Sequence, residues 1–532
     1  MTKILNLNKE SVAEALRQGK ITITIAGLNY IGISLAALLA DEGAKVIGCD
    51  TDPNIVDLLA KGKNDVAEHD LAWLMKQGVF GKKAELARGL CPNCGVTLLN
   101  FQGDILCPSC GMSMELNEKG AHIKGLSKKY KKAVEKSMSL KKLLKKNIEQ
   151  NKFEATTDVF NAFLKSDVAI ITINAVIGPP PDYPPDLSRL TEICKSIGGA
   201  LKKGDLVIIK GLVTPGTTEG LIKTILETQS RLKAGSQFGL AYMPEKAEEG
   251  NVIFELRTAS KIVGGIDQKS LNAAAALFSV FPAEIYPVKS IKVAETAKLI
   301  EEVYSDVNLA FANEVATTCQ KLGVDALDVI EAINTRPRIY IPSPGPAGGK
   351  KAQNSLFLFN FQAIRSGYNP QLITWGHRIN EHMPSQVLEM VKDAFGTMGL
   401  PIKESKVSVL GVSSKAGVAT IENSPSFQVI KALTEQGAKV AIHDPYANLD
   451  LVRIHLRDVA SATRNVKDAL KAANCAIIMV DHPEYRYLRP SDFAKKMKKR
   501  SSIIDAKRIF DPNEVNKAGL IYMGTGYPLM PI

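Results

Sequence analysis

The stretch ITITIAGLNYIGISLAALLADEGAKVIGCDTDP, Ile21–Pro53, decides the fold of the first part of this chain. Its β-branched run Ile21–Ala26 ends at a glycine and predicts a buried strand. The apolar segment Ile31–Asp41 predicts a helix, and Lys45–Cys49 predicts a second strand. The stretch therefore predicts a strand, a glycine turn, a helix and a second strand that ends next to Asp50.

This order is typical of dinucleotide-binding folds. Their glycines let the backbone approach a pyrophosphate at the helix N-terminus, and the acid bonds the ribose hydroxyls. Gly27 and Gly32 fit the fingerprint, but its middle glycine is Asn29, which would crowd the pyrophosphate. The unit is predicted to bind a dinucleotide, and the alternative is a Rossmann-type unit that has lost this ability. The predicted cofactor-binding residues are Gly27, Asn29, Tyr30, Ile31, Gly32 and Asp50.

The length and composition are those of a large globular chain. Its 532 residues are too many for one hydrophobic core and predict roughly two to four domains. We find no apolar run of about 18 residues, so we expect no membrane span. The N-terminus lacks the apolar core of a signal peptide, which predicts a cytoplasmic protein. The net charge of +12 matters only where it is clustered.

Four cysteines form the clearest local motif. They follow a CxxC-x12-CxxC spacing, with a glycine after each pair. Paired thiolates on two tight turns predict a closed tetrahedral zinc site on a short ribbon, with the metal in a structural role. Coincidental cysteines are the alternative. The predicted ligands are Cys91, Cys94, Cys107 and Cys110.

A lysine-rich segment, LSKKYKKAVEKSMSLKKLLKKNIEQNK, follows the cysteines and has a loosely helical apolar spacing. The ribbon and this segment, within residues 119–152, could bind nucleic acid or another polyanion through phosphate contacts. The alternative is a solvated helix that returns the chain to its host domain. Aromatic residues are sparse there, which gives base stacking little support.

The alternating pattern resumes after Phe153 and predicts further strands and helices. The chain is predicted to be an α/β protein with two Rossmann-like domains joined by a central helical domain, and a four-cysteine zinc-ribbon insertion in the first. The predicted strands are Val168–Ile173, Leu206–Lys210, Phe238–Met243, Lys261–Val263, Lys406–Val412, Lys439–His443, Cys475–Val480 and Ser502–Asp505. The predicted domains are residues 1–290 with the insertion at 81–151, then 291–400 and 401–532.

This plan resembles the UDP-sugar 6-dehydrogenases, and more closely their UDP-N-acetylmannosamine branch than UDP-glucose dehydrogenase. The resemblance covers nearly the whole chain apart from about Gly81 to Asn151. Besides the opening stretch, it is carried by PPDLSRL, TPGTTEGL, MPEKAEEGNVIFELRTASKIVGG, AETAKLIEEVYSDVNLAFANEVA, RPRIYIPSPGPAGG, GHRINEHMP, SSKAGVATIENSP, HDPYA, DHPEY, IIDAKRIFD and YMGTGYP.

The resemblance implies NAD in the first domain, a nucleotide sugar in the last, and a homodimer or larger homo-oligomer built through the central helices. It also implies a four-electron oxidation of a primary alcohol to a carboxylate. In that reaction a cysteine thiolate carries a thioester, and a lysine and an asparagine stabilise oxyanions. A threonine, glutamates and an aspartate position water and move protons.

Matched position by position, this sequence retains part of that set. Lys298 matches the lysine, and Glu245 and Glu249 match the glutamates. The implied substrate-binding residues are Gly348, Gly349 and Lys415. Five positions differ. This chain has Lys351 in place of the family cysteine, Leu212 in place of the threonine and Glu302 in place of the asparagine. It has Ser355 in place of the aspartate and Glu422 in place of an arginine of the last domain.

Whether the chain is an enzyme is therefore open. Lys351 could form a Schiff base, hold an acidic ligand by its charge, or lie at a solvated loop tip. Glu302, one helical turn after Lys298, could pair with it and neutralise the charge that an oxyanion needs. Three hypotheses remain: a nucleotide-sugar oxidoreductase with altered chemistry, a non-catalytic scaffold or regulator that binds nucleotides, and a nucleic-acid-associated protein.

Overall fold

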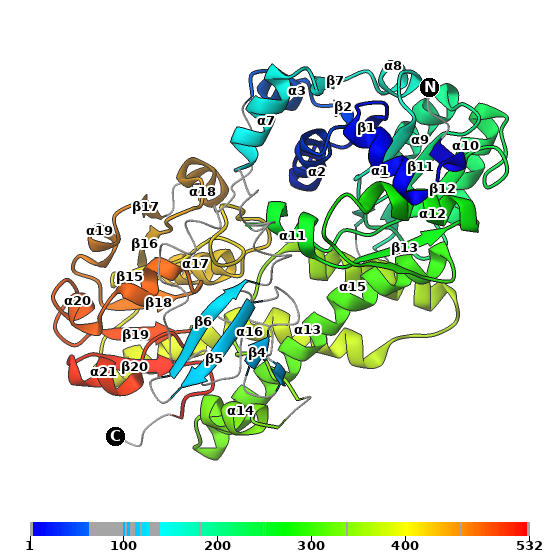
Figure 1. The fold of residues 1–532 in the computed structure, drawn as a ribbon. Coiled ribbons are helices and arrows are strands. Elements are labelled where there is room, and N and C mark those ends of the chain that lie inside the picture. The colour runs from blue at the N-terminus through cyan, green and yellow to red at the C-terminus, as the bar shows by residue number, and fades with distance from the viewer. Residues whose placement is uncertain are drawn as a thin grey trace. The chain divides into compact units, whose positions relative to one another are not determined.

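The computed structural model describes residues 4–62, 139–179, 183–247, 249–250, 252–336, 339–457 and 460–528, together with four strands between residues 99 and 126. The chain forms two compact units, and Figure 1 labels many of their helices and strands. The first contains residues 1–302 and 354–369, and the second contains residues 303–353 and 370–532.

The first unit is built on an eight-stranded sheet in which only β12 and β13 pair antiparallel among the described strands. The sheet order is β14 (Ile285–Pro287), β13 (Lys261–Gly265), β12 (Gly239–Tyr242), β11 (Leu206–Ile209), β8 (Val168–Ile171), β1 (Thr22–Ala26), β2 (Lys45–Cys49) and β7 (Phe153–Thr156). Strand β1 lies between β2 and β8, so the winding direction reverses beside β1. This reversal is the place where doubly wound sheets bind ligands.

Helices cover both faces of this sheet because its strands are buried on both sides. The first face packs its core against α1 (Lys9–Arg17), α2 (Tyr30–Asp41), α7 (Leu140–Glu149), α11 (Val252–Thr258) and α12 (Gln268–Phe278). The other face packs against α8 (Val159–Leu164), α9 (Ser188–Ala200) and α10 (Lys223–Ser230). The remaining elements are η1 (Ile4–Asn6), α3 (Pro53–Ala60), the hairpin strands β9 (Val176–Ile177) and β10 (Pro185–Asp186), and the π-helical turn η3 (Thr218–Ile222).

The second unit repeats the doubly wound order with six parallel strands. They are β17 (Ser461–Thr463), β16 (Lys439–His443), β15 (Lys406–Leu410), β18 (Cys475–Ile478), β19 (Ser502–Asp505) and β20 (Ile521–Gly524). Its helices are α14 (Ala326–Asn334), α16 (Gln371–Met398), α17 (Ser426–Glu435), α18 (Leu449–Leu456), α19 (Val466–Leu470), η4 (Pro483–Tyr487), α20 (Pro490–Ala494) and α21 (Pro512–Lys517).

The helices predicted for residues 291–400 are present, and their contacts divide them between the two units. Helix α13 (Ile291–Leu322) and helix α15 (Lys350–Arg365) each contribute residues to both. Helix α13 begins at Ile291, the first residue of the predicted central domain. The predicted strands of both sheets are confirmed, with ends that shift by one or two residues.

The insertion contains a four-stranded antiparallel sheet of β3 (Leu99–Phe101), β4 (Asp104–Leu106), β5 (Met112–Asn117) and β6 (Gly120–Leu126). Its first two strands form a hairpin between the two predicted cysteine pairs. The cysteines themselves, Cys91, Cys94, Cys107 and Cys110, lie outside the described residues.

The end of the lysine-rich segment belongs to the core of the first unit. Leu140, Leu143 and Leu144 of α7 are buried against that core, and Asn147 donates a hydrogen bond to the Ala37 carbonyl at 2.8 Å. Residues 140–149 therefore form a helix of the first unit, although the sequence analysis placed them in the insertion. This agrees with the alternative of a helix that returns the chain to its host domain.

Candidate functional site

The glycine turn after β1 has the close packing that the sequence predicts. Gly27 has a φ of +99°, and a Cβ there would lie 2.8 Å from the Ile173 side chain. A Cβ on Gly32 would collide with the Gly27 carbonyl oxygen. Both positions therefore require glycine, and the turn packs closely against the start of α2, as in a dinucleotide-binding unit.

The side chain of Asn29, which was expected to crowd a pyrophosphate, lies at the N-terminus of α2. It caps α2: Oδ1 accepts hydrogen bonds from the Ile31 and Gly32 amides, both at 3.0 Å. Its Nδ2 donates to the Thr172 carbonyl at 3.0 Å. Tyr30 begins the helix behind this cap. The asparagine is thus folded onto the helix N-terminus, because a side-chain oxygen there satisfies amides that have no partner within the helix.

Asp50 follows β2 and is directed at the same turn. Its Oδ2 accepts a hydrogen bond from the Leu28 amide at 2.7 Å, and its Oδ1 accepts one from the Asp52 amide at 3.1 Å. Two hydrogen bonds leave acceptor capacity on a carboxylate, which offers about four lone-pair positions. The acid is therefore placed where a ribose would need it, and the residues of this unit fit a dinucleotide except for the Asn29 cap.

Glu245 lies in a buried cluster with two lysines. Its Oε2 lies 3.1 Å from Lys210 Nζ, with side-chain exposures of 10% and 1%. Burial acts to raise the pKa of Glu245, but Lys210 and Lys261 outweigh it and lower that pKa to about 2. Burial lowers the pKa of Lys261 to about 8. Glu245 therefore stays ionised and tied to Lys210, while Glu249 is half-buried nearby in the chain.

Lys298 is paired in the way that the sequence suggested. Its Nζ lies 2.6 Å from Glu302 Oε1 and 3.8 Å from Glu301 Oε2 on the same helix. Only 9% of the lysine side chain and 20% of the Glu302 side chain is exposed. This confirms the predicted pairing, and the ammonium charge of Lys298 is opposed at short range.

The positions of the family threonine and aspartate hold a leucine side chain in an apolar cluster and a buried serine hydroxyl. Leu212 packs into an apolar cluster with Ala175, Leu299 and Leu358. Ser355 is completely buried, and its hydroxyl has no hydrogen-bond partner among the described residues. Neither position offers an ionisable group.

The loop Pro342–Gly349 packs against the carboxyl ends of strands in the second unit. A Cβ on Gly348 would lie 2.8 Å from the Asn423 carbonyl and 2.9 Å from the Ser414 carbonyl, in the segment after β15. Lys507, which follows β19, donates to the Pro346 carbonyl at 3.2 Å. The loop therefore crosses the ligand-binding end of this sheet, and the half-buried Lys415 belongs to the same end.

Lys350 and Lys351 are part of a helix, so the alternative in which Lys351 lies at a loop tip is wrong. Gly349, with a φ of +114°, ends the loop, and α15 begins at the next residue. Alanine, glutamine and leucine follow, and these residues favour a helix. The backbone of Lys351 thus lies in the first helical turn.

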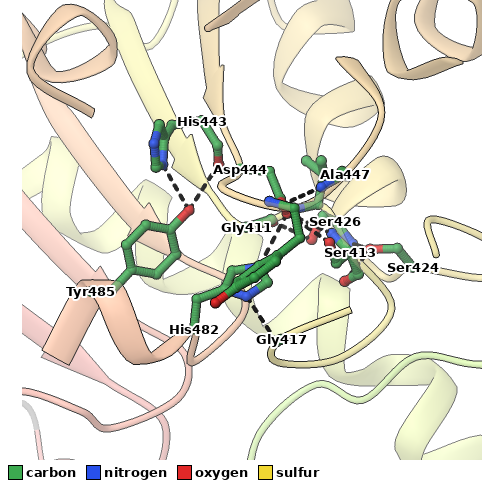
Figure 2. A network of polar contacts seen from close by, with 12 residues as sticks. Gly411, Ser413, Gly417, Ser424, Ser426, His443, Asp444, Ala447, His482 and Tyr485 are labelled. Atoms are coloured by element: carbon green, nitrogen blue, oxygen red, sulfur yellow. Dashed lines mark hydrogen bonds and ion pairs between the residues drawn. The ribbon is translucent and has the colours of Figure 1, made fainter. Parts of the chain in front are cut away.

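A polar network that the sequence analysis did not predict surrounds Asp444 (Figure 2). His482 Nδ1 accepts from the Gly417 amide at 3.0 Å, which leaves the proton on Nε2 for Asp444 Oδ2 at 3.1 Å. The remaining donors to Asp444 are the amides of Val412, Ser413, Tyr446 and Ala447 and the Ser413 hydroxyl. A buried histidine after a predicted strand was the one available signal for this network.

Asp444 follows its strand as Asp50 does in the first unit. Unlike those of Asp50, its carboxylate oxygens already accept most of their hydrogen bonds from the protein itself. Burial acts to raise its pKa, whereas His482 and the backbone amides hold that pKa well below its usual range. Beside it, Tyr485 bonds both Nδ1 and the carbonyl of His443, each at 2.9 Å. Asp444 therefore fixes the turn after β15 and has little capacity left for a ligand.

Other reactive groups in the described part of the chain do not replace the missing thiolate. Cys49, Cys194, Cys319 and Cys475 are free and buried. Burial raises the pKa of Cys194 to about 12, and of Cys475 likewise to about 12. Among the described residues no group of three or more His, Cys, Asp or Glu could hold a metal ion. No described helix has the length and apolar character needed to cross a membrane.

Two doubly wound sheets, one of them with a dinucleotide-type glycine turn, define a protein with two Rossmann-type domains. The chain matches the NAD binding domain of the UDP-glucose/GDP-mannose dehydrogenase family over residues 21–88 and 116–282. It matches the central domain of that family over residues 292–382 and the UDP binding domain over residues 408–512.

Individual relatives agree with the domain matches. A UDP-N-acetyl-D-mannosamine dehydrogenase from Pyrococcus horikoshii is 30% identical over 343 residues, which cover 64% of this chain and 77% of that protein. One from Methanococcus maripaludis is 25% identical over 501 residues, 93% of this chain and 95% of that protein. The solved structure of the Pyrococcus horikoshii enzyme is 25% identical, with a TM-score of 0.74 over 95% of this chain and 99% of that one. The chain belongs to the UDP-glucose/GDP-mannose dehydrogenase family.

Proposed function

We propose that the first unit binds NAD, that the second unit binds a UDP-sugar, and that the chain does not complete oxidation of the sugar alcohol to a carboxylate. The family's NAD and UDP binding domains support the two ligands. The surroundings of Lys298 and Leu212, and the lysine at position 351 in place of the cysteine, support the loss of the full reaction.

The Lys298–Glu302 pair carries this proposal. In the family reaction that the resemblance implies, a lysine stabilises oxyanions, and such donors act best when they are aimed at the developing charge in a site that excludes water. Here Glu302 lies 2.6 Å from that ammonium. An oxyanion that formed near Lys298 would be repelled by the Glu302 carboxylate. Lys298 therefore stabilises such a transition state less.

The position of the nucleophile supports the same conclusion. The lysine at position 351 cannot form the thioester through which the family reaction reaches the acid. Glu245 is held as a carboxylate by Lys210, which makes it a poor proton donor near neutral pH. A single hydride transfer that ends at an aldehyde remains compatible with these residues, and so does binding without reaction.

The test is to incubate the purified chain with NAD and one UDP-sugar at a time. The three UDP-sugars are UDP-glucose, UDP-N-acetylglucosamine and UDP-N-acetylmannosamine. NADH is followed by absorbance, and products are identified by mass spectrometry after an aldehyde trap. We expect no carboxylate and at most one NADH per sugar. Two NADH per sugar with a carboxylate product would refute the proposal, and a trapped aldehyde would identify a two-electron enzyme.

A variant pair tests the role of Glu302 directly. Glu302→Asn removes the carboxylate nearest to Lys298 and should raise any aldehyde formation about tenfold or more. Glu301→Gln is the matched control, because Glu301 lies 3.8 Å from Lys298 and is 43% exposed. An equal effect of the two substitutions would show that the short pair is not what limits the reaction.

We also propose that the four predicted cysteines bind one structural zinc ion, since their spacing is that of a closed tetrahedral site. Metal analysis of the purified chain should find about one zinc per chain. Cys107→Ser should abolish it, whereas Cys319→Ser, which changes a buried thiol of α13, should not. Full zinc content in the Cys107→Ser chain would refute this assignment.

A further inference from the structure

The side chain of Asn29 joins two parts of the first unit. Its Oδ1 accepts from the Ile31 and Gly32 amides at the start of α2, and its Nδ2 donates to the Thr172 carbonyl. The orientation of the amide is fixed by its partners, because the reverse would place its NH₂ group against two amide donors and its oxygen against a carbonyl. All three hydrogen bonds are 3.0 Å long.

These hydrogen bonds lie at the reversal point of the sheet. Thr172 directly follows β8, and Gly32 lies in the helix that follows β1, so Asn29 links the carboxyl ends of the two neighbouring strands. Doubly wound sheets bind a dinucleotide at this point, with its pyrophosphate on the helix N-terminus. The side-chain amide of Asn29 therefore lies where a pyrophosphate would bind. It also accepts hydrogen bonds from two of the backbone amides that a pyrophosphate would use.

The turn around Asn29 is held closely on both sides. Asp50 accepts a hydrogen bond from the Leu28 amide at 2.7 Å, and the Thr172 hydroxyl donates to the Gly27 carbonyl at 2.5 Å. Because the backbone on either side is fixed, the side chain of Asn29 is the part that can move to admit a ligand. A rotation about its own χ angles would release the Ile31 and Gly32 amides without moving the glycine turn.

We propose that Asn29 sets the affinity of the first unit for a dinucleotide by competing with the pyrophosphate for the Ile31 and Gly32 amides. The inference rests on the proposed binding of NAD. A phosphate forms charge-assisted hydrogen bonds to these amides and displaces the neutral amide oxygen. The cap and the link to Thr172 must be broken first, so the dinucleotide binds more weakly than it would to a glycine at this position.

The test is isothermal titration of NAD into the full-length chain and its Asn29→Gly, Asn29→Asp and Asn448→Gly variants. Asn448 is the matched control: it caps α18 in the second unit through the Asp450 and Leu451 amides. We expect Asn29→Gly to tighten NAD binding about fivefold, because it removes the link to Thr172, roughly one net hydrogen bond, together with the weaker effect of the cap. Asn29→Asp should weaken it about tenfold, because a carboxylate would face the pyrophosphate. Asn448→Gly should leave it unchanged.

Two further measurements separate competition from a structural role. Asn29→Gly removes a cap, so it should lower the melting temperature of the unliganded chain while it tightens NAD binding. If Asn29 had only a structural role, its substitution would lower both the melting temperature and the affinity for NAD. Adenosine, which has no pyrophosphate, should bind the wild-type chain and Asn29→Gly equally.

The outcomes also distinguish this inference from the proposed function. Unchanged or weaker NAD binding by Asn29→Gly would refute the competition and leave NAD binding intact. If neither the wild-type chain nor any variant binds NAD, both the competition and the proposed cofactor are refuted. Tighter binding of adenosine by Asn29→Gly would show that the asparagine acts on access to the whole site, and would refute competition for the pyrophosphate amides.

Discussion

Glu245, Lys210 and Lys261 place two cations and one anion in the interior of the first unit. Lys210 Nζ also donates to the Met243 carbonyl at 3.2 Å and lies 4.9 Å from the centre of the Phe278 ring. Each lysine therefore depends on Glu245 for most of its compensation, since charges buried without a partner are expensive. Because Glu245 is paired with these lysines, it is a weak candidate for proton transfer, although the sequence retains it.

Glu245→Gln should destabilise the chain by about 3–5 kcal/mol, because it leaves two buried lysines without their carboxylate. Urea unfolding followed by circular dichroism measures the change. The control is Glu404→Gln, which breaks an ion pair with Lys439 in which both side chains are more than two-thirds exposed. That change should cost less than about 1 kcal/mol, and a comparable loss in the two variants would contradict the assigned role of burial.

The stabilising effect of Glu245 should depend on pH. Burial acts to raise the pKa of Glu245, but Lys210 and Lys261 lower it from its ordinary value of 4.5 to about 2 in the folded chain. A carboxyl with a lowered folded-state pKa stabilises fully above the unfolded value and loses that effect as the pH falls through the folded one. The stability difference between wild type and Glu245→Gln should therefore be constant above about pH 5 and shrink by up to roughly 3 kcal/mol toward pH 2. A difference that does not change between pH 6 and pH 3 would contradict this assignment.

At the scale of elements, local patterns predicted most of the two sheets because their strands are short buried runs bounded by glycine or an acid. The start of α15 was missed because the glycines and prolines before it suggested a longer loop. The link from Asn29 to Thr172 could not be predicted, since Thr172 is 143 residues away in the chain. The Asp444 network was missed for the same reason: His482 lies 38 residues further on. Contacts of this kind depend on which strands become neighbours.

Helix α7 provides an element-scale prediction. Leu143 is fully buried in the core of the first unit, so Leu143→Ala should destabilise the chain by about 2–5 kcal/mol. Lys145→Ala, in the same helix, is the control, because the Lys145 side chain is 75% exposed. Its effect should stay within about 0.5 kcal/mol. Denaturant unfolding of both variants checks this, and a small effect of Leu143→Ala would mean that α7 belongs to the insertion after all.

At the scale of the whole molecule, α13 presents an exposed apolar stripe. The large apolar side chains that α13 exposes are Val293, Ile300, Tyr304, Phe311 and Leu322. Their spacings of 7, 4, 7 and 11 residues are close to whole numbers of helical turns, so they share one face. We propose that a second copy of the chain covers this stripe, as the resemblance to dimeric dehydrogenases implies. A symmetric dimer brings the same surface of each copy together, and a long stripe on one helix can meet itself in this way.

The dimer is tested by sedimentation of the full-length chain, which has a mass of 57.6 kDa. We expect the wild type to sediment at about twice that mass. Phe311→Glu places a charge in the centre of the stripe and should shift the population to monomer, because an unpaired charge in an interface is costly. Leu451→Glu is the matched control: Leu451 lies on α18 and is 52% exposed, against 53% for Phe311. A monomeric wild type would refute the dimer, and dissociation by Leu451→Glu alone would place the interface on α18 rather than on α13.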